Sequence, residues 1–282
     1  VRRAQTPWPQ TLWLNEGPDP PGLRLILTPI AARTIDEAAL RLPSAAFGAA
    51  TVWIVWRWLE TAALPGVALV AAGLVAILPV QVYYSQEVGQ YALAMLLAAG
   101  LLLAFERVAH FARARDWLLA TAPTLAALGS YYGVAMLLPS LDLVLAWRLW
   151  KRGERRVWWG FAAYHAVVAL AVATLYALYL RTQFAKFSPG NLSPWFLGAG
   201  PRAIVRWLPD AAASLLRFQI LPYSESAPAA LLALPAALAA LGSVALVRRG
   251  DAGRGIALAL WATFLLLYAA NGFGLYPFGH RY

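Results

Sequence analysis

Residues 65–106 read PGVALVAAGLVAILPVQVYYSQEVGQYALAMLLAAGLLLAFE and determine the architecture of the chain. They hold two apolar runs, near 65–84 and 91–106, with a short polar turn between them. A helix needs about 20 apolar residues to cross the roughly 30 Å hydrocarbon core of a bilayer. The stretch therefore predicts two membrane helices joined by a tight turn. This turn carries one acid, Glu87, with no Lys or Arg beside it.

The composition of the whole chain favours the same interpretation. Of its 282 residues, 61% are hydrophobic and 13% are charged, which is too apolar for one water-soluble core. The apolar runs are continuous and about 15 to 23 residues long, whereas the strands of a membrane barrel alternate in segments of about ten. We therefore expect an all-α polytopic membrane protein with about eight transmembrane helices. They are predicted near 40–58, 65–84, 91–106, 116–129, 133–149, 158–180, 228–247 and 255–271.

The basic residues gather in short clusters between the apolar runs and predict the topology. The net charge is +10, and the clusters lie at 107–115, 148–156 and 248–254. Basic loops face the cytoplasm by the positive-inside rule, and two successive inside loops need an even number of crossings between them. Residues 116–149 are therefore predicted to form a hairpin. Because the charge is explained by membrane orientation, we expect no nucleic-acid partner.

We expect a single transmembrane domain over residues 1–282. Its predicted parts are an outer-face loop and juxtamembrane helix at 1–39, six spans at 40–180, an outer-face interfacial loop at 181–227, two spans at 228–271 and an outer-face segment at 272–282. The helix at 22–33 is too short to span a bilayer. The chain has no Cys, which excludes disulfides and thiolate chemistry. It has no initiator Met and stops at GHRY, so we expect a fragment.

Four stretches carry a resemblance to a known family. They are DPPGLRLIL (19–27), DEAALRLPSAAFGAATVWIVWRW (36–58), LPVQVYYSQEVGQYAL (78–93) and the terminal PFGHRY (277–282). In order and spacing the chain resembles the GT-C membrane glycosyltransferases of the family 39 group, which includes protein O-mannosyltransferases and the aminoarabinose transferases of lipid A. It departs from the pattern at Gly89, where the family usually has Arg, and at Asp19, where His or an acid is common.

The resemblance implies a GT-C type fold and an inverting glycosyltransferase. Such an enzyme transfers a hexosyl or pentosyl group from a polyprenyl-phosphate donor to a protein, lipid or glycan acceptor on the outer face of the membrane. It also implies that the catalytic base is an Asp upstream of Val1, so that this fragment lacks its own base. We expect an integral protein of a bacterial inner membrane, with a site that faces the periplasm or the exterior.

Glu87 is the first candidate site residue, because an ionisable group close to a membrane-embedded site is costly to keep there without a role. We assign it to acceptor or metal binding, with an ordinary wetted turn acid as the alternative. Gln86 and Gln90 flank it as candidate substrate ligands. The metal is unknown, and a divalent ion bound by Glu87 is the candidate cofactor.

Arg41 begins a span on the predicted outer face, against the positive-inside rule, and this predicts an anionic partner. The partner would be a site carboxylate or the lipid phosphate, and the alternative is snorkelling at the interface. Asp19 is a candidate catalytic acid or a solvated loop residue. His280 and Arg281 are candidates for holding the leaving phosphate, because guanidinium groups present several donors to phosphate oxygens.

Two other functions remain open. A non-enzymatic transporter or lipid flippase would place polar residues near the bilayer midplane, and Asp142 with Pro139 favours this reading. We expect Asp142 to pair within the bundle or to face a water-filled cavity, and His165 to be structural. A degenerate family member that serves as a partner subunit is the third possibility, suggested by Gly89 in place of Arg.

Overall fold

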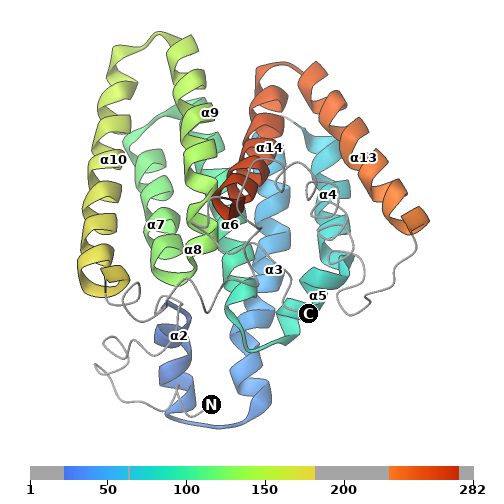
Figure 1. The fold of residues 1–282 in the computed structure, drawn as a ribbon, viewed down its shortest axis with the longest axis vertical. Helices are drawn as coiled ribbons and strands as arrows, with labels where there is room; N and C mark the ends of the chain where they lie inside the picture. The colour runs from blue at the N-terminus through green and yellow to red at the C-terminus, as the bar shows by residue number, and fades with distance from the viewer. Residues whose placement is uncertain (1–21, 63, 182–228, 273–282) are drawn as a thin grey trace. The chain divides into compact units, whose positions relative to one another are not determined.

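The computed structural model describes residues 22–62, 64–181 and 229–272, and the regular elements of these residues are all helical (Figure 1). This confirms the all-α prediction. The elements are α2 (Gly22–Ala31), α3 (Glu37–Thr61), α4 (Pro65–Ile77), α5 (Pro79–Gln86), α6 (Gln90–Phe111), α7 (Ala114–Ser130), α8 (Tyr132–Ala135), α9 (Leu137–Arg152), α10 (Arg155–Leu175), the π-helical turn η2 (Tyr176–Leu180), α13 (Ala229–Arg248) and α14 (Asp251–Gly272).

Helices occupy all eight places where spans are predicted. Among the described residues, four helices are long and apolar enough to cross a membrane, namely 37–61, 90–111, 133–152 and 155–178. The bent pair α4 and α5 makes a fifth if it is one span. The protein is therefore a polytopic helical membrane protein. The helix predicted at 22–33 is present as α2, which at 10 residues is too short to span.

The helices belong to two compact units, which we describe separately. Unit 1 contains α2 to α4, most of α5, and α6 to α10 with η2. Unit 2 contains α13 and α14, together with Leu78–Val80. That the whole chain forms one domain stays a prediction.

A proline explains why the run at 65–84 is bent. The axes of α4 and α5 differ by 56° across Leu78, the residue before Pro79. The Pro ring disfavours the helical conformation of the preceding residue, so the first helix ends there and the second begins at the proline. The apolar run is therefore one membrane segment in sequence but two helices in space.

Helix α6 lies at the centre of unit 1 and packs against α3, α7 and α9 (Figure 1). Its buried residues include Leu101 and Val108, and many of the others are alanines. Small residues let helix backbones approach closely, which matters in lipid because the surrounding acyl chains are as apolar as the side chains. A similar contact joins α10 to α7, where the indole of Trp117 lies against Gly160 and would collide with any Cβ there.

Two ion pairs show that α7 and α9 form the predicted hairpin. Near its end, α6 contacts the start of α7 through Arg107 and Asp116, at 3.0 Å. The same end of α6 contacts the end of α9 through Glu106 and Arg148, at 2.8 Å. Because the start of α7 and the end of α9 meet the same helix end, the two helices run in opposite directions. The chain turns between them at Tyr131, which is extended.

These contacts define the basic end of unit 1, formed by the last turns of α6 and α9 and the first turns of α7 and α10. Arg148 Nη1 donates to both carboxylate oxygens of Glu106, and His110 Nε2 lies 3.0 Å from the same carboxylate. Glu106 is 5% exposed and Arg148 12%. Arg152 donates to the carbonyls of Ala109 and His110, which α6 leaves unpaired at its C-terminus.

We predict that Arg148→Met destabilises the protein by about 3–5 kcal/mol, because it leaves the buried Glu106 carboxylate without its main partner. Thermal unfolding in detergent measures the effect. Arg57→Met is the matched control, since Arg57 forms an exposed pair with Glu60 at 2.8 Å and such pairs contribute about 0–1 kcal/mol. Equal losses in the two variants would contradict a special role for the Glu106 pair.

A second polar pair lies within the bundle, where Asp142 of α9 meets His165 of α10. His165 Nε2 is 3.3 Å from Asp142 Oδ2, and His165 Nδ1 is 2.9 Å from the carbonyl oxygen of Phe161. A carbonyl only accepts, so the contact with Phe161 is a hydrogen bond when Nδ1 carries the hydrogen, and this leaves Nε2 facing the Asp142 carboxyl group. The prediction that Asp142 pairs within the bundle is confirmed.

We expect the Asp142 and His165 substitutions to be strongly non-additive. Asp142→Leu or His165→Phe alone leaves a half-buried polar partner unpaired in an apolar setting, at a cost of about 1–3 kcal/mol. The double variant replaces both partners and recovers part of this loss, with a coupling of about 0.5–3 kcal/mol. Thermal midpoints of the four proteins in detergent measure the coupling. Additive losses would show that the two side chains do not interact.

Unit 2 is a helical hairpin of α13 and α14. The chain reverses at Gly250, whose φ of +90° favours glycine. Gly253 packs against the carbonyl of Leu246, and the Trp261 indole donates to the Ser243 hydroxyl at 2.9 Å. The two helices predicted at 228–247 and 255–271 are therefore present.

Candidate functional site

Of the predicted site residues that the structure describes, Gln86, Glu87 and Gln90 lie at the turn between α5 and α6, and Arg41 lies in the first turns of α3. We call this region the Glu87 end of unit 1. It includes the start of α3, helix α5, residues 87–91 and the turn at Tyr131. Helix α6 runs from here to the basic end over its 22 residues, about 33 Å at 1.5 Å per residue.

Helix α5 is held against α3 by a buried amide. Gln81 is buried, and its Nε2 donates to the carbonyl oxygen of Gly48 at 3.1 Å. Ser85 packs onto Gly48 at a place where a Cβ would collide with the hydroxyl, and Ser85 itself donates to the carbonyl of Gln81. These contacts place the turn that follows α5. Sequence reasoning did not identify Gln81, although a Gln four residues before Ser85 in an apolar run is a visible signal.

A row of tyrosines joins this turn to the turn between α7 and α8. The ring centroids are 5.1 Å apart for Tyr83 and Tyr84, 4.5 Å for Tyr84 and Tyr91, and 5.8 Å for Tyr91 and Tyr131. The sequence predicts that these two turns face the same side of the membrane. The aromatic contacts confirm that they lie at the same end of the bundle.

Glu87 lies half-buried on the turn itself. Its carbonyl accepts from the Gly89 N–H at 2.9 Å, and among the described residues its carboxylate has no hydrogen bond or ion pair. The acid is therefore available to an outside group. Gln86 beside it is exposed, and Gln90 is half-buried at the first position of α6.

The structure shows no backbone reason for glycine at position 89. Gly89 is extended, with φ −146° and ψ 166°, a conformation open to any residue. A Cβ added there would lie 3.5 Å from the Glu87 carboxyl carbon, which is ordinary contact. The Arg that is usual in the family would thus fit the backbone and would stand beside this acid. With Gly at this position, no cation pairs with Glu87 among the residues that the structure describes.

Arg41 lies in the first turns of α3, about 10 Å along the helix from Gly48 at 1.5 Å per residue. Its guanidinium pairs with Glu37 at 2.6 Å, and the two side chains are 49% and 74% exposed. Arg41 therefore has a carboxylate partner, but this partner is a helix neighbour and not Glu87. Its predicted pairing with a site carboxylate or with lipid phosphate stays a prediction.

Three predicted site residues, Asp19, His280 and Arg281, lie outside the described residues. So does the interfacial loop predicted at 181–227, apart from its first residue. Among the described residues, no group of three His, Asp or Glu side chains comes close enough to hold a metal ion. A divalent ion bound by Glu87 would therefore need ligands from substrate or from residues outside the described ranges.

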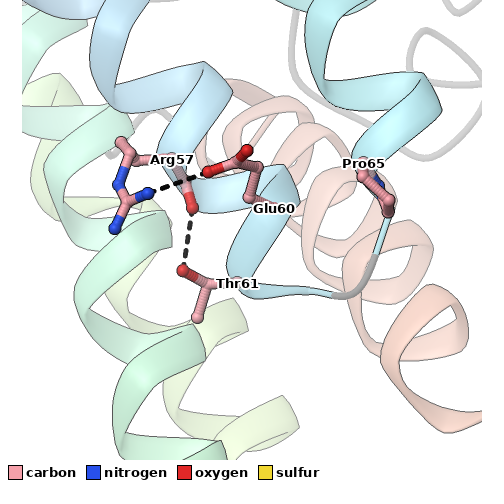
Figure 2. Close-up of a pocket in the computed structure, with 4 residues that line it drawn as sticks. All are labelled: Arg57, Glu60, Thr61 and Pro65. Carbon is pink, nitrogen blue, oxygen red and sulfur yellow. Dashed lines mark hydrogen bonds and ion pairs between the residues drawn. The ribbon is translucent and has the colours of Figure 1, made fainter.

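A surface hollow also occurs, away from Glu87, at the turn between α3 and α4 (Figure 2). Arg57, Glu60, Thr61 and Pro65 line it. In Figure 2 the Arg57 guanidinium points at Glu60, and the Thr61 hydroxyl donates to the Arg57 carbonyl at 2.8 Å. The cation and the acid that line the hollow are thus paired with each other.

Four of the described helices are long and apolar enough to cross a membrane, and they make the chain an integral membrane protein. The chain belongs to the dolichyl-phosphate-mannose-protein mannosyltransferase family, whose model matches residues 20–184, more than half of the chain. The matched region contains all the described parts of the Glu87 end. No curated protein and no solved structure shows a significant match.

We predict that Glu87 and Gln81 differ in their effect on stability. Glu87→Gln removes a charge without a partner and changes the free energy of unfolding by no more than about 0.5 kcal/mol. Gln81→Leu leaves the buried Gly48 carbonyl unpaired and costs about 1–3 kcal/mol. Thermal unfolding in detergent distinguishes the two. A large loss with Glu87→Gln would mean that the acid serves the fold.

Proposed function

We propose that this protein transfers a sugar from a polyprenyl-phosphate donor to an acceptor on the outer face of a bacterial inner membrane, with inversion at the anomeric carbon. The observation that supports the proposal is the half-buried carboxylate of Glu87, which among residues 22–62, 64–181 and 229–272 has no hydrogen bond or ion pair and which lies within the part of the chain that the family model covers. The acceptor is a protein, a lipid or a glycan.

In this reaction an acceptor hydroxyl attacks the anomeric carbon while the bond from that carbon to the phosphate oxygen breaks. A carboxylate takes the hydroxyl proton, and the polyprenyl phosphate leaves with the bonding electrons. We assign the base to an Asp outside the described residues. Glu87 orients the acceptor, alone or through a divalent metal ion, with help from Gln86 and Gln90. Asp19 adds a second acid to the site.

The leaving phosphate gains negative charge, so the site needs a cation that is free to move to it. Arg41 meets this need because its pair with Glu37 is exposed and spaced i to i+4, and such pairs contribute only about 0.3–0.5 kcal/mol. A phosphate group can therefore replace Glu37 as the partner of Arg41 and form charge-assisted hydrogen bonds with it. His280 and Arg281 would complete the phosphate surround.

We expect Glu87→Gln and Arg41→Ala each to lower sugar transfer at least tenfold, about 1.4 kcal/mol of transition-state stabilisation. The assay follows radiolabelled sugar from the polyprenyl-phosphate donor into acceptor, with the full-length protein in native membranes. Arg57→Ala is the matched control, because this Arg belongs to a similarly exposed pair in the last turn of the same helix. Normal transfer by both site variants would overturn the residue assignments.

The Asp142 and His165 pair favours a second candidate function, a transporter or lipid flippase. Polar residues of this kind within a membrane segment mark ion or substrate pathways in transporters. The same radiolabelled donor distinguishes the two functions. Translocation across sealed vesicles without covalent transfer would support the transporter and exclude the glycosyltransferase.

A further inference from the structure

The acids at the basic end of unit 1 are all engaged with cations that point into the structure. Glu106 pairs with Arg148 and lies beside His110, and Asp116 pairs with Arg107. Glu154 pairs with Arg152, with 3.0 Å between the two side chains. Asp116 is fully buried and also accepts from the backbone N–H of Arg113. These pairs connect the helix ends. Among the described residues of the basic end, every acid is therefore already paired, and none remains for the other cations near the turns at 112–113 and 153–154.

Four arginines remain at these turns, and among the described residues none of them has an acid partner. They are Arg113, Arg115, Arg155 and Arg156, and all four are exposed. Arg113 lies over the Phe111 ring at 5.3 Å, which orients its guanidinium without neutralising it. We call this group the arginine surface.

The two turns that carry the arginine surface are neighbours in space. Arg152, directly before the second turn, donates to the carbonyls of Ala109 and His110, directly before the first, at 3.2 and 3.1 Å. The four unpaired charges therefore act from one region. Like charges this close repel one another, which raises the affinity of the region for an anion.

Exposed aromatic side chains border the arginine surface and place it at the level of lipid headgroups. Trp150 is 74% exposed and Trp159 79%, and Trp158 and Phe111 are exposed as well. Trp side chains concentrate where the hydrocarbon meets the headgroups, because one side of the ring is apolar and the indole N–H is polar. Arginines next to them then lie among the phosphates of the same leaflet.

We propose that the arginine surface binds the phosphate groups of anionic phospholipids. The forked guanidinium donors match phosphate oxygens, and an anionic leaflet attracts cations close to its surface. Orientation during membrane insertion requires only positive charge, whereas here the acids of the basic end pair with other cations, and among the described residues none forms an ion pair with these four arginines. The surface is separate from the proposed donor site, because it lies at the opposite end of α6. It therefore stands whether or not the proposed function is right.

The test measures the thermal midpoint of the full chain in detergent after addition of phosphatidylglycerol or phosphatidylcholine. A ligand that binds the folded state raises the midpoint. We expect phosphatidylglycerol to raise it by several degrees and phosphatidylcholine to have little effect. The shift should shrink with added salt, because salt screens exposed charges. Equal shifts with the two lipids, or a shift that salt leaves unchanged, would overturn the proposal.

Variants locate the binding. Arg115→Gln with Arg156→Gln should lose at least half of the phosphatidylglycerol shift. Arg33→Gln with Arg181→Gln is the matched control, because it removes the same charge from two exposed arginines that, among the described residues, also lack acid partners. Equal loss in both double variants would show a net-charge effect only and would overturn the assigned surface.

A soluble anion is the last alternative. Inorganic phosphate at the same concentration as phosphatidylglycerol should give a much smaller shift, since only the lipid adds acyl-chain contact beside the exposed tryptophans. If inorganic phosphate reproduced the full shift, the surface would be a site for soluble anions and the lipid proposal would be wrong. The double variants keep all the buried pairs of the basic end, so they are expected to fold.

Discussion

The ion pair between Glu106 and Arg148 is the interaction on which the rest of unit 1 depends. It joins the central helix α6 to α9, two helices whose contact residues are 42 positions apart in the chain. Both side chains are largely withdrawn from water. Loss of either one would leave the other as a buried charge without its main partner, which is costly, so the two residues stabilise the fold only together. Close to this pair, Asp116 at the start of α7 accepts a hydrogen bond from Arg107 of α6. Arg152 of α9 donates to the Ala109 carbonyl in the last turn of α6.

The two ends of unit 1 use charge in opposite ways. At the basic end, acids are buried and paired, and the surplus is a group of exposed arginines. At the Glu87 end, tyrosine contacts and the buried Gln81 amide hold the turns, while the Glu87 carboxylate stays without a partner among the described residues. Among the described residues, the contacts that hold the turns of this end are therefore made by neutral side chains.

The helical runs and the hairpin at 116–149 could be predicted because both follow from local composition and from the positions of Lys and Arg along the chain. Pro79 likewise marks the bend between α4 and α5, although the continuous apolar run hides it. The pair of Arg41 with Glu37 follows from local spacing, because residues four apart are neighbours on a helix surface. The position of Arg41 against the positive-inside rule predicts a site carboxylate or lipid phosphate as the partner instead.

The sequence by itself determined that the chain is a polytopic helical membrane protein, the approximate positions of its helices, and which turns carry Glu87 and the basic clusters. These properties depend on the run lengths that a bilayer demands and on the backbone hydrogen bonds that each helix satisfies internally. Only the tertiary structure decided that Arg148 pairs with Glu106, that His165 lies beside Asp142, and that Gln81 donates to the carbonyl of Gly48. Such pairs join residues about 20 to 40 positions apart, and their geometry depends on how helices pack, which the spacing along one helix does not contain.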